Sequence, residues 1–153
     1  MMTTKRSTAS PRFRELDDSE SRVVLGQHHV GRLAFTLHDK VDLEPISYVL
    51  VGDWLYCRTS PGTKLLTLAH NPWVAFEVDE IRGPFDWRSV VVRGTAYFLI
   101  AGIRGDHSYD EAVDHLRSID QRALTHEDLA PHRTVLFRIH VNDISGRAAS
   151  THE

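Results

Sequence analysis

The chain has 153 residues, of which 41% are hydrophobic and 25% are charged, and its formal net charge at pH 7 is -3. These values are typical of one soluble domain and leave little room for a second independent core. The net negative charge argues against nucleic acid as the main partner. Apolar runs such as "SYVLV" and "TAYFLIAGI" are too short to cross a bilayer, so we expect no membrane partner.

The first residues, "MMTTKRSTASPRFR", are basic and polar and lack the apolar centre of a secretory signal. We therefore predict a disordered tail over residues 1–16, a single domain over residues 17–147 and a C-terminal tail over residues 148–153. Cys57 is the only cysteine, which excludes an intrachain disulfide and a cysteine-rich zinc site. A single thiol suits the reducing cytoplasm, where we expect the protein to reside.

In chain order, the hydrophobic pattern first predicts a short helix that Asp18 or Ser19 caps and that ends near Gly26. Alternating apolar residues then predict six strands. Their ranges are 30–38, 45–51, 54–59, 73–79, 87–100 and 134–141. Two further helices are predicted within residues 60–71 and from Ser108, where Ser108 and Glu111 have the spacing of a capping box.

The connections between the strands favour a mainly β fold, an antiparallel sheet curled into a small barrel. Gly52 and Asp53 indicate a two-residue hairpin between the second and third strands, which makes these strands antiparallel neighbours. A parallel Rossmann sheet would need a helix between them. Gly94 interrupts a long strand pattern, where we predict a bulge or a sharp bend.

The stretch "CRTSPGTKLLTLAHNP", residues 57–72, gathers cations and hydroxyls around one short turn. Its polar residues are Arg58, Thr59, Ser60 and Lys64. Ser60 is predicted to cap a helix that begins at Pro61. Free N–H groups, the helix dipole and two cations together favour an anion such as phosphate. A capped helix with two solvated cations explains the same spacing equally simply.

The histidines and the cysteine indicate no metal site and no catalytic residue. The ten histidines show no metal-ligand spacing, so we expect no metal site. Cys57 is in phase with Leu55 on its strand, which indicates an inert, half-buried thiol. Trp87, beside the polar strand start "RSVVV", is a candidate wall for a ligand.

Several motifs occur together and in order: G-R-L-A-F from Gly31, T-x-x-G-x-K from Thr59, N-P-x-V-x-F-E-V-D from Asn71 and W-x-S-V-V-V-x-G from Trp87. With them, residues 30 to 100 resemble the pyridoxamine 5′-phosphate oxidase-like FMN-binding split barrels, especially the branch related to nitroimidazole-resistance proteins. The ending "RIHVNDISGR" is similar to that branch too.

The resemblance implies a homodimer of six-stranded split barrels that binds FMN in clefts between the subunits. It assigns the phosphate end of the cofactor site to Arg58, Thr59, Ser60, Thr63 and Lys64. It assigns the isoalloxazine side to Ile46, Ser47, Tyr48 and Val49. Ser89 would make a polar flavin contact, and Trp87 would lie near the ring or the dimer seam. In such a protein the flavin is the reactive group, so no catalytic side chain is predicted.

Two departures argue against pyridoxamine 5′-phosphate oxidase activity itself. Thr63 and Lys64 stand where those oxidases usually carry Arg-Lys, and no substrate segment with Trp and Arg follows Arg138. The expected function is an FMN-dependent oxidoreductase that acts on a small molecule. The alternatives are a non-catalytic carrier of flavin, deazaflavin or haem, and an interaction protein without a ligand. A haem carrier would use a histidine such as His28, His29 or His140.

Overall fold

The computed structural model describes residues 10–151, with the side chains of residues 37 and 63–66 outside the description. The strands are β1 (Arg12–Leu16), β2 (Val30–Leu37), β3 (Lys40–Val51), β4 (Trp54–Thr59), β5 (Trp73–Gly83), β6 (Asp86–Leu99) and β7 (Val135–Ser150). The helices are α1 (Asp18–Gln27), α2 (Thr63–His70) and α3 (Ser108–Arg117). Every predicted element is thus present, and β1 is additional.

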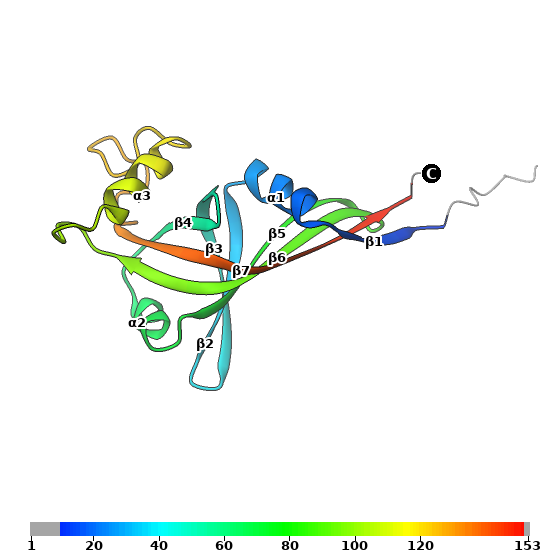
Figure 1. The fold of residues 1–153 in the computed structure, drawn as a ribbon, viewed down its shortest axis with the longest axis horizontal. Coiled ribbons are helices and arrows are strands. Elements are labelled where there is room, and N and C mark those ends of the chain that lie inside the picture. Colours follow the sequence, from blue (N-terminus) through cyan, green and yellow to red (C-terminus); the bar gives the residue numbers. More distant parts are fainter. Residues whose placement is uncertain (1–9, 152–153) are drawn as a thin grey trace, which may run out of the picture.

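Six of the strands form a closed antiparallel ring, in the order β7-β4-β3-β2-β5-β6, because β6 also pairs with β7 (Figure 1). The predicted six-stranded barrel is therefore confirmed. Gly52 has a φ of +59° in the tight turn between β3 and β4, so the predicted hairpin is confirmed too.

The barrel interior holds the apolar face that alternation predicts on each strand. Phe76 and Val78 of β5 and Phe137 and Ile139 of β7 are all at most 1% exposed. Residues of α1 and α2 join the same core at its ends, among them Leu25 and Leu68. None of the helices among residues 10–151 is long and apolar enough to span a membrane.

The sheet extends beyond the domain limits predicted at residues 17 and 147. Strand β1 pairs with β7 from Arg12 opposite Ser150 to Leu16 opposite Gly146. The side chain of Leu16 is buried in the barrel core, which explains why this segment of the expected tail joins the domain. The two strands lie side by side at one end of the molecule (Figure 1).

The starts of α1 and α3 differ from the prediction by one or two residues. Asp17 caps α1, and a reciprocal capping box with Glu20 replaces the expected cap at Asp18 or Ser19. His107 precedes α3, whereas the expected cap, Ser108, is the first helical residue and binds the Asp106 carboxylate. In both cases a preceding carboxylate accepts an N–H of the first turn, that of Glu20 at Asp17 and that of Ser108 at Asp106.

The predicted irregularity at Gly94 is confirmed as a register shift between β6 and β7. A Cβ atom at residue 94 would lie 2.0 Å from the carbonyl oxygen of His140. The two backbones approach too closely there for any side chain, which explains the glycine.

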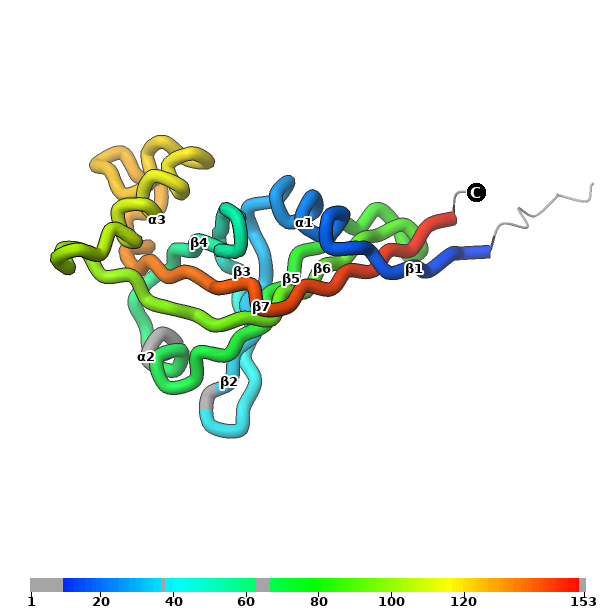
Figure 2. Tube along the Cα trace, in the orientation of Figure 1, coloured from blue at the N-terminus to red at the C-terminus, as the bar shows by residue number. Residues whose placement is uncertain are grey.

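Helix α3 covers the outer face of β3, β4 and β7 through a second apolar cluster. This cluster includes Val49, Tyr56, Ala112, Leu116 and Leu136. The chain then runs through turns, residues 118–134, before it enters β7 (Figure 2, yellow to orange). The outer face of β2 and β5 carries Ala34, Ala75 and an exposed Trp73 in a shallow depression.

Candidate functional site

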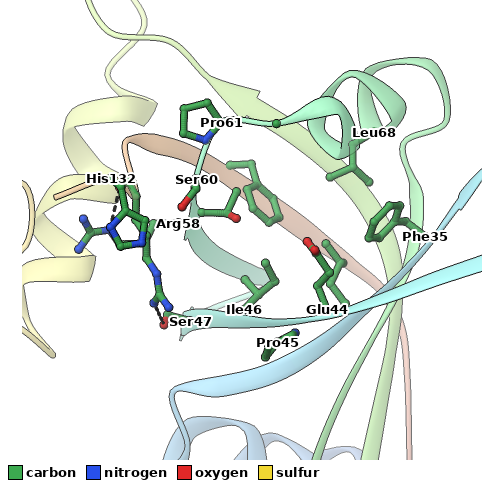
Figure 3. A pocket seen from close by; sticks show the side chains of 15 residues that line it. Phe35, Glu44, Pro45, Ile46, Ser47, Arg58, Ser60, Pro61, Leu68 and His132 are labelled. Atoms are coloured by element: carbon green, nitrogen blue, oxygen red, sulfur yellow. Dashed lines mark hydrogen bonds between the residues drawn. The ribbon is translucent and has the colours of Figure 1, made fainter. Parts of the chain in front are cut away.

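A cleft of about 430 Å³ lies between β3 and the segment that leads from the end of β4 into α2. Figure 3 shows Ile46 and Ser47 of β3 on one side and Ser60 and Pro61 on the other. The remaining lining residues are Leu33, Phe35, Glu44, Pro45, Arg58, Thr59, Gly62, Leu68, His132, Arg133 and Phe137. The volume is in the range that proteins use for small molecules and cofactors.

The two ends of this cleft differ in chemistry. At one end Phe35 and Leu68 present apolar side chains beside the carboxylate of Glu44, and at the other Ser47, Arg58 and His132 present polar groups (Figure 3). A ligand that suits both ends has a flat apolar part and a polar or charged part.

The cleft includes the N-terminal end of α2, where the structure differs from the predicted cap. Gly62, not Ser60, is the N-cap, and α2 begins at Thr63. The N–H groups of the first helical turn therefore point out of the helix near Ser60 and Gly62, and the helix dipole makes this end positive. The side chains of Thr63 and Lys64 lie outside the described residues, so their predicted contacts with phosphate stay predictions.

Arg58 lines the cleft, but its guanidinium is committed to the protein rather than free for a ligand. Its Nη2 donates to the Asp128 Oδ2 at 2.6 Å and to the Ala130 carbonyl oxygen at 3.1 Å. Its Nε donates to the Arg133 carbonyl oxygen at 3.1 Å. The Arg58 and Asp128 side chains are 7% and 3% exposed. A buried carboxylate therefore neutralises the Arg58 charge, and the predicted contact of Arg58 with a phosphate stays a prediction.

Asp128 is held as tightly as Arg58. Besides the guanidinium, the backbone N–H groups of Leu124 and Ala130 donate to its carboxylate. The hydrogen bond from Arg58, supported by these N–H groups, keeps the pKa of Asp128 well below its usual value of 3.8. The Asp128 carboxylate therefore stays ionised at physiological pH, and its hydrogen bonds fix residues 124–130 beside the end of β4.

Of the four β3 residues expected along the ring, Ile46 and Ser47 line the cleft. The other two side chains point elsewhere. Tyr48 lies inside the barrel and donates its hydroxyl to the Leu25 carbonyl oxygen at 2.6 Å, and Val49 packs in the cluster beneath α3.

Trp87 and Ser89 do not join this cleft. Trp87 lines a second cleft, of about 390 Å³, with Arg14, Arg82 and Arg88, near the strand ends of β1 and β7. The Ser89 hydroxyl donates to Glu77 Oε2 at 3.0 Å on the neighbouring β5. Within one chain the two predicted flavin contacts are thus separate from the cleft that contains Ser60.

Comparison with known proteins places the chain in a family. The model of the family described as pyridoxamine 5′-phosphate oxidase matches residues 17–148. The chain belongs to the pyridoxamine 5′-phosphate oxidase family. An uncharacterized protein of Rhizobium meliloti is 32% identical over 94 residues, which are 61% of this chain and 62% of that relative. The match therefore spans less than two thirds of the relative's length.

Several solved structures resemble the chain over most of its length. An FAD-binding protein of Mesorhizobium loti is 33% identical, with a TM-score of 0.73, and 92% of this chain and 99% of that one are covered. An FAD-binding protein of Mycobacterium smegmatis is 27% identical, with a TM-score of 0.65 and coverages of 88% and 98%. A candidate 5-nitroimidazole antibiotic resistance protein of Bacteroides thetaiotaomicron, 16% identical with a TM-score of 0.65 and coverages of 92% and 89%, shares the fold.

Three polar residues of this family member line the cleft although the sequence patterns did not indicate them: Glu44, His132 and Arg133. His132 and Arg133 precede β7, whose first residue, Val135, pairs with Thr59 at the end of β4. The start of an antiparallel strand lies beside the end of its neighbour, so this pairing brings both residues to the predicted phosphate end. The pairing of β4 with β7 would have assigned His132 and Arg133 to the cleft, but hydrophobic alternation alone does not reveal which strands pair.

Among the described residues of this family member, no three His, Cys, Asp or Glu side chains gather as metal ligands. Two of the histidines named for haem have other partners. His28 Nε2 lies 2.8 Å from Glu80 Oε1, and the ring of His140 contacts Trp54 with 4.9 Å between ring centroids. Neither residue lines the cleft that contains Ser60.

Proposed function

We propose that the protein binds a flavin nucleotide, FMN, in the cleft between β3 and α2. The observation that carries this proposal is the division of the cleft into an apolar end and a polar end at a helix N-terminus. A flavin mononucleotide has the matching parts, a flat tricyclic ring and a phosphate on a flexible chain.

The residues present fit this group. Thr59, Ser60 and the N–H groups at the start of α2 would hold the phosphate, with Thr63 and Lys64 beside them in the sequence. Ile46 and Ser47, with the backbone of β3, would lie along the ring. These residues bind and orient, while hydride or electron transfer is the chemistry that a flavin supplies when bound.

From this binding we infer an FMN-dependent oxidoreductase of the cytoplasm that acts on a small molecule. Family membership and two relatives described as FAD-binding support a flavin. Because those relatives are described with FAD, affinity for FAD is to be measured beside affinity for FMN.

A titration tests the proposal. Purified protein is added to a fixed, low concentration of FMN while flavin fluorescence is recorded, and the same is done with riboflavin and FAD. We expect saturable quenching by FMN with one equivalent per chain, and weaker binding of riboflavin, which lacks the phosphate. No change in flavin fluorescence or absorbance with any of the three ligands would contradict the proposal. A Soret band after incubation with haem would instead support the carrier alternative.

We further infer that two copies of the chain pair through the outer face of β2, β5 and β6. Trp73 is 64% exposed there, beside Ala34, Thr36 and Ala75 in a shallow apolar depression. A second copy would remove this surface from water. In such a pair Trp87 of the partner subunit could complete a flavin site, as the family resemblance implies.

Substitution of Trp73 tests this pairing. We expect the wild-type protein to sediment with twice the mass of one chain and Trp73→Glu to sediment as a monomer, because the new charge would be buried at the interface. Val23→Glu, an equally drastic change at an exposed position of α1, is the control and should remain dimeric. A monomeric wild type, or a dimeric Trp73→Glu variant, would contradict this interface.

A further inference from the structure

Residues 118–134, the turn segment after α3, contribute a charged wall to the cleft. Arg133 and His132 lie at its end, and both line the cleft. The Arg133 Nη1 donates to the Ser47 hydroxyl at 3.1 Å, so its side chain extends across the polar end toward β3. This contact connects the turn segment with the strand that carries Ile46.

Two observations distinguish Arg133 from Arg58. Arg58 is buried and neutralised by Asp128, whereas Arg133 is exposed and its described hydrogen-bond partner is a neutral hydroxyl. No ion pair to a carboxylate is found for Arg133 among the residues that the structure describes. Arg133 thus brings to the cleft a positive charge that no described ion pair holds, with a planar fork that suits a phosphate.

Arg58 determines where this charge lies. Its Nε holds the backbone carbonyl of Arg133 itself, and its Nη2 holds that of Ala130, while Asp128 fixes the turn between α3 and β7. Arg58, which the motif predicted as a phosphate ligand, therefore orients the backbone of Arg133, 75 positions later in the chain.

We propose that Arg133 binds the phosphate of the flavin nucleotide and that Arg58 is its positioning residue. This inference rests on the proposed function and adds a ligand from a segment outside the motif. The pairing of Thr59 with Val135 brings Arg133 to the end of the cleft that contains Ser60. One phosphate there can accept hydrogen bonds from the start of α2 and from Arg133 together.

The experiment compares FMN and riboflavin on the full-length protein. Arg133→Ala should weaken FMN binding about tenfold and leave riboflavin binding unchanged, because only FMN carries the phosphate. Arg133→Lys should recover part of the loss, since the charge returns without the fork. Arg122→Ala is the matched control: Arg122 is exposed on the same segment, outside the cleft, and pairs with Asp120 at 3.7 Å.

If Arg133→Ala loses affinity for FMN and riboflavin equally, or loses affinity for neither, the proposed role of Arg133 is overturned. If the wild-type protein binds neither, the proposed function itself fails, which is a separate outcome. With FAD as a third ligand, a loss for FMN and FAD alike assigns the contact to the phosphate next to the ribityl chain. A loss of affinity for FAD alone, with FMN affinity unchanged, would overturn the proposed contact between Arg133 and the phosphate of FMN.

A double substitution tests the positioning role of Arg58. Arg58→Lys keeps a charge beside Asp128 but lacks the fork that reaches the carbonyls of Ala130 and Arg133. We expect Arg58→Lys to weaken the binding of FMN but not of riboflavin. In a protein that already carries Arg133→Ala, Arg58→Lys should reduce FMN affinity little further, because the same phosphate contact is already lost. Additive losses for FMN would show that Arg58 contacts the phosphate independently, and would overturn the positioning role.

Discussion

Replacing Asp128 by alanine is expected to lower the free energy of unfolding by about 3 kcal/mol, because it leaves the Arg58 guanidinium buried without its counter-charge. The carboxylate also accepts hydrogen bonds from two backbone N–H groups, which would lose their partner. Chemical denaturation of the wild type and the variant measures the difference. Asp143→Ala is the control, since Asp143 is 66% exposed and lies 3.6 Å from Arg93, and it should change stability little.

The pH dependence gives this prediction a second readout. The pKa of Asp128 is lower in the folded chain than its usual value of 3.8, so the stabilisation is complete above that value. It is lost as pH falls through the lower, folded-state pKa. The difference between wild type and Asp128→Ala should therefore be constant from pH 5 to pH 7, values well above 3.8, and shrink in strong acid. A difference that disappears already near neutral pH would contradict the ion pair.

Gly62→Asp is expected to have opposite effects on stability and on FMN binding. The backbone at residue 62 is extended, with a φ of 175°, and a Cβ there meets nothing within 4 Å, so aspartate fits without strain. As an N-cap it should stabilise α2 by about 0.5 kcal/mol. Its charge would repel a phosphate at the same N–H groups, and FMN affinity should fall about thirtyfold, or about 2 kcal/mol.

Gly62→Asn distinguishes the effect of the negative charge at residue 62 from the effect of a side chain of the same size. Asparagine caps a helix as well as aspartate does but is neutral, so it should match the gain in stability with a much smaller loss of FMN affinity. Riboflavin affinity should be similar in both variants. If aspartate and asparagine reduce FMN binding equally, the phosphate does not lie at the start of α2.

Hydrophobic alternation predicted the fold well because the inward face of each strand is continuous in the sequence. Phe76 and Val78 of β5 and Phe137 and Ile139 of β7 needed no tertiary information to be assigned to the core. Strand β1 was missed because only Leu16 of its five residues is buried, so it shows no alternation. It forms because β7 continues to Ser150 and offers a free edge.

The site was harder to predict than the fold. The T-x-x-G-x-K motif lies along the cleft, since Thr59, Ser60 and Gly62 all line it. It could not reveal that Arg58 has a buried partner 70 residues later, or that Arg133 lies opposite Ser47. Such contacts depend on the register of β4 against β7 and on the turns after α3, and neither leaves a local pattern in the sequence.

The most direct test of the central claim is a crystal structure of the protein grown with FMN. We predict electron density for the phosphate beside Thr59, Ser60 and the N–H groups that follow Gly62, and density for the ring against Ile46 and Ser47. The guanidinium of Arg133 should contact the phosphate, while Arg58 remains paired with Asp128. FMN bound at another place, with the cleft between β3 and α2 occupied by protein side chains or water, would contradict the account.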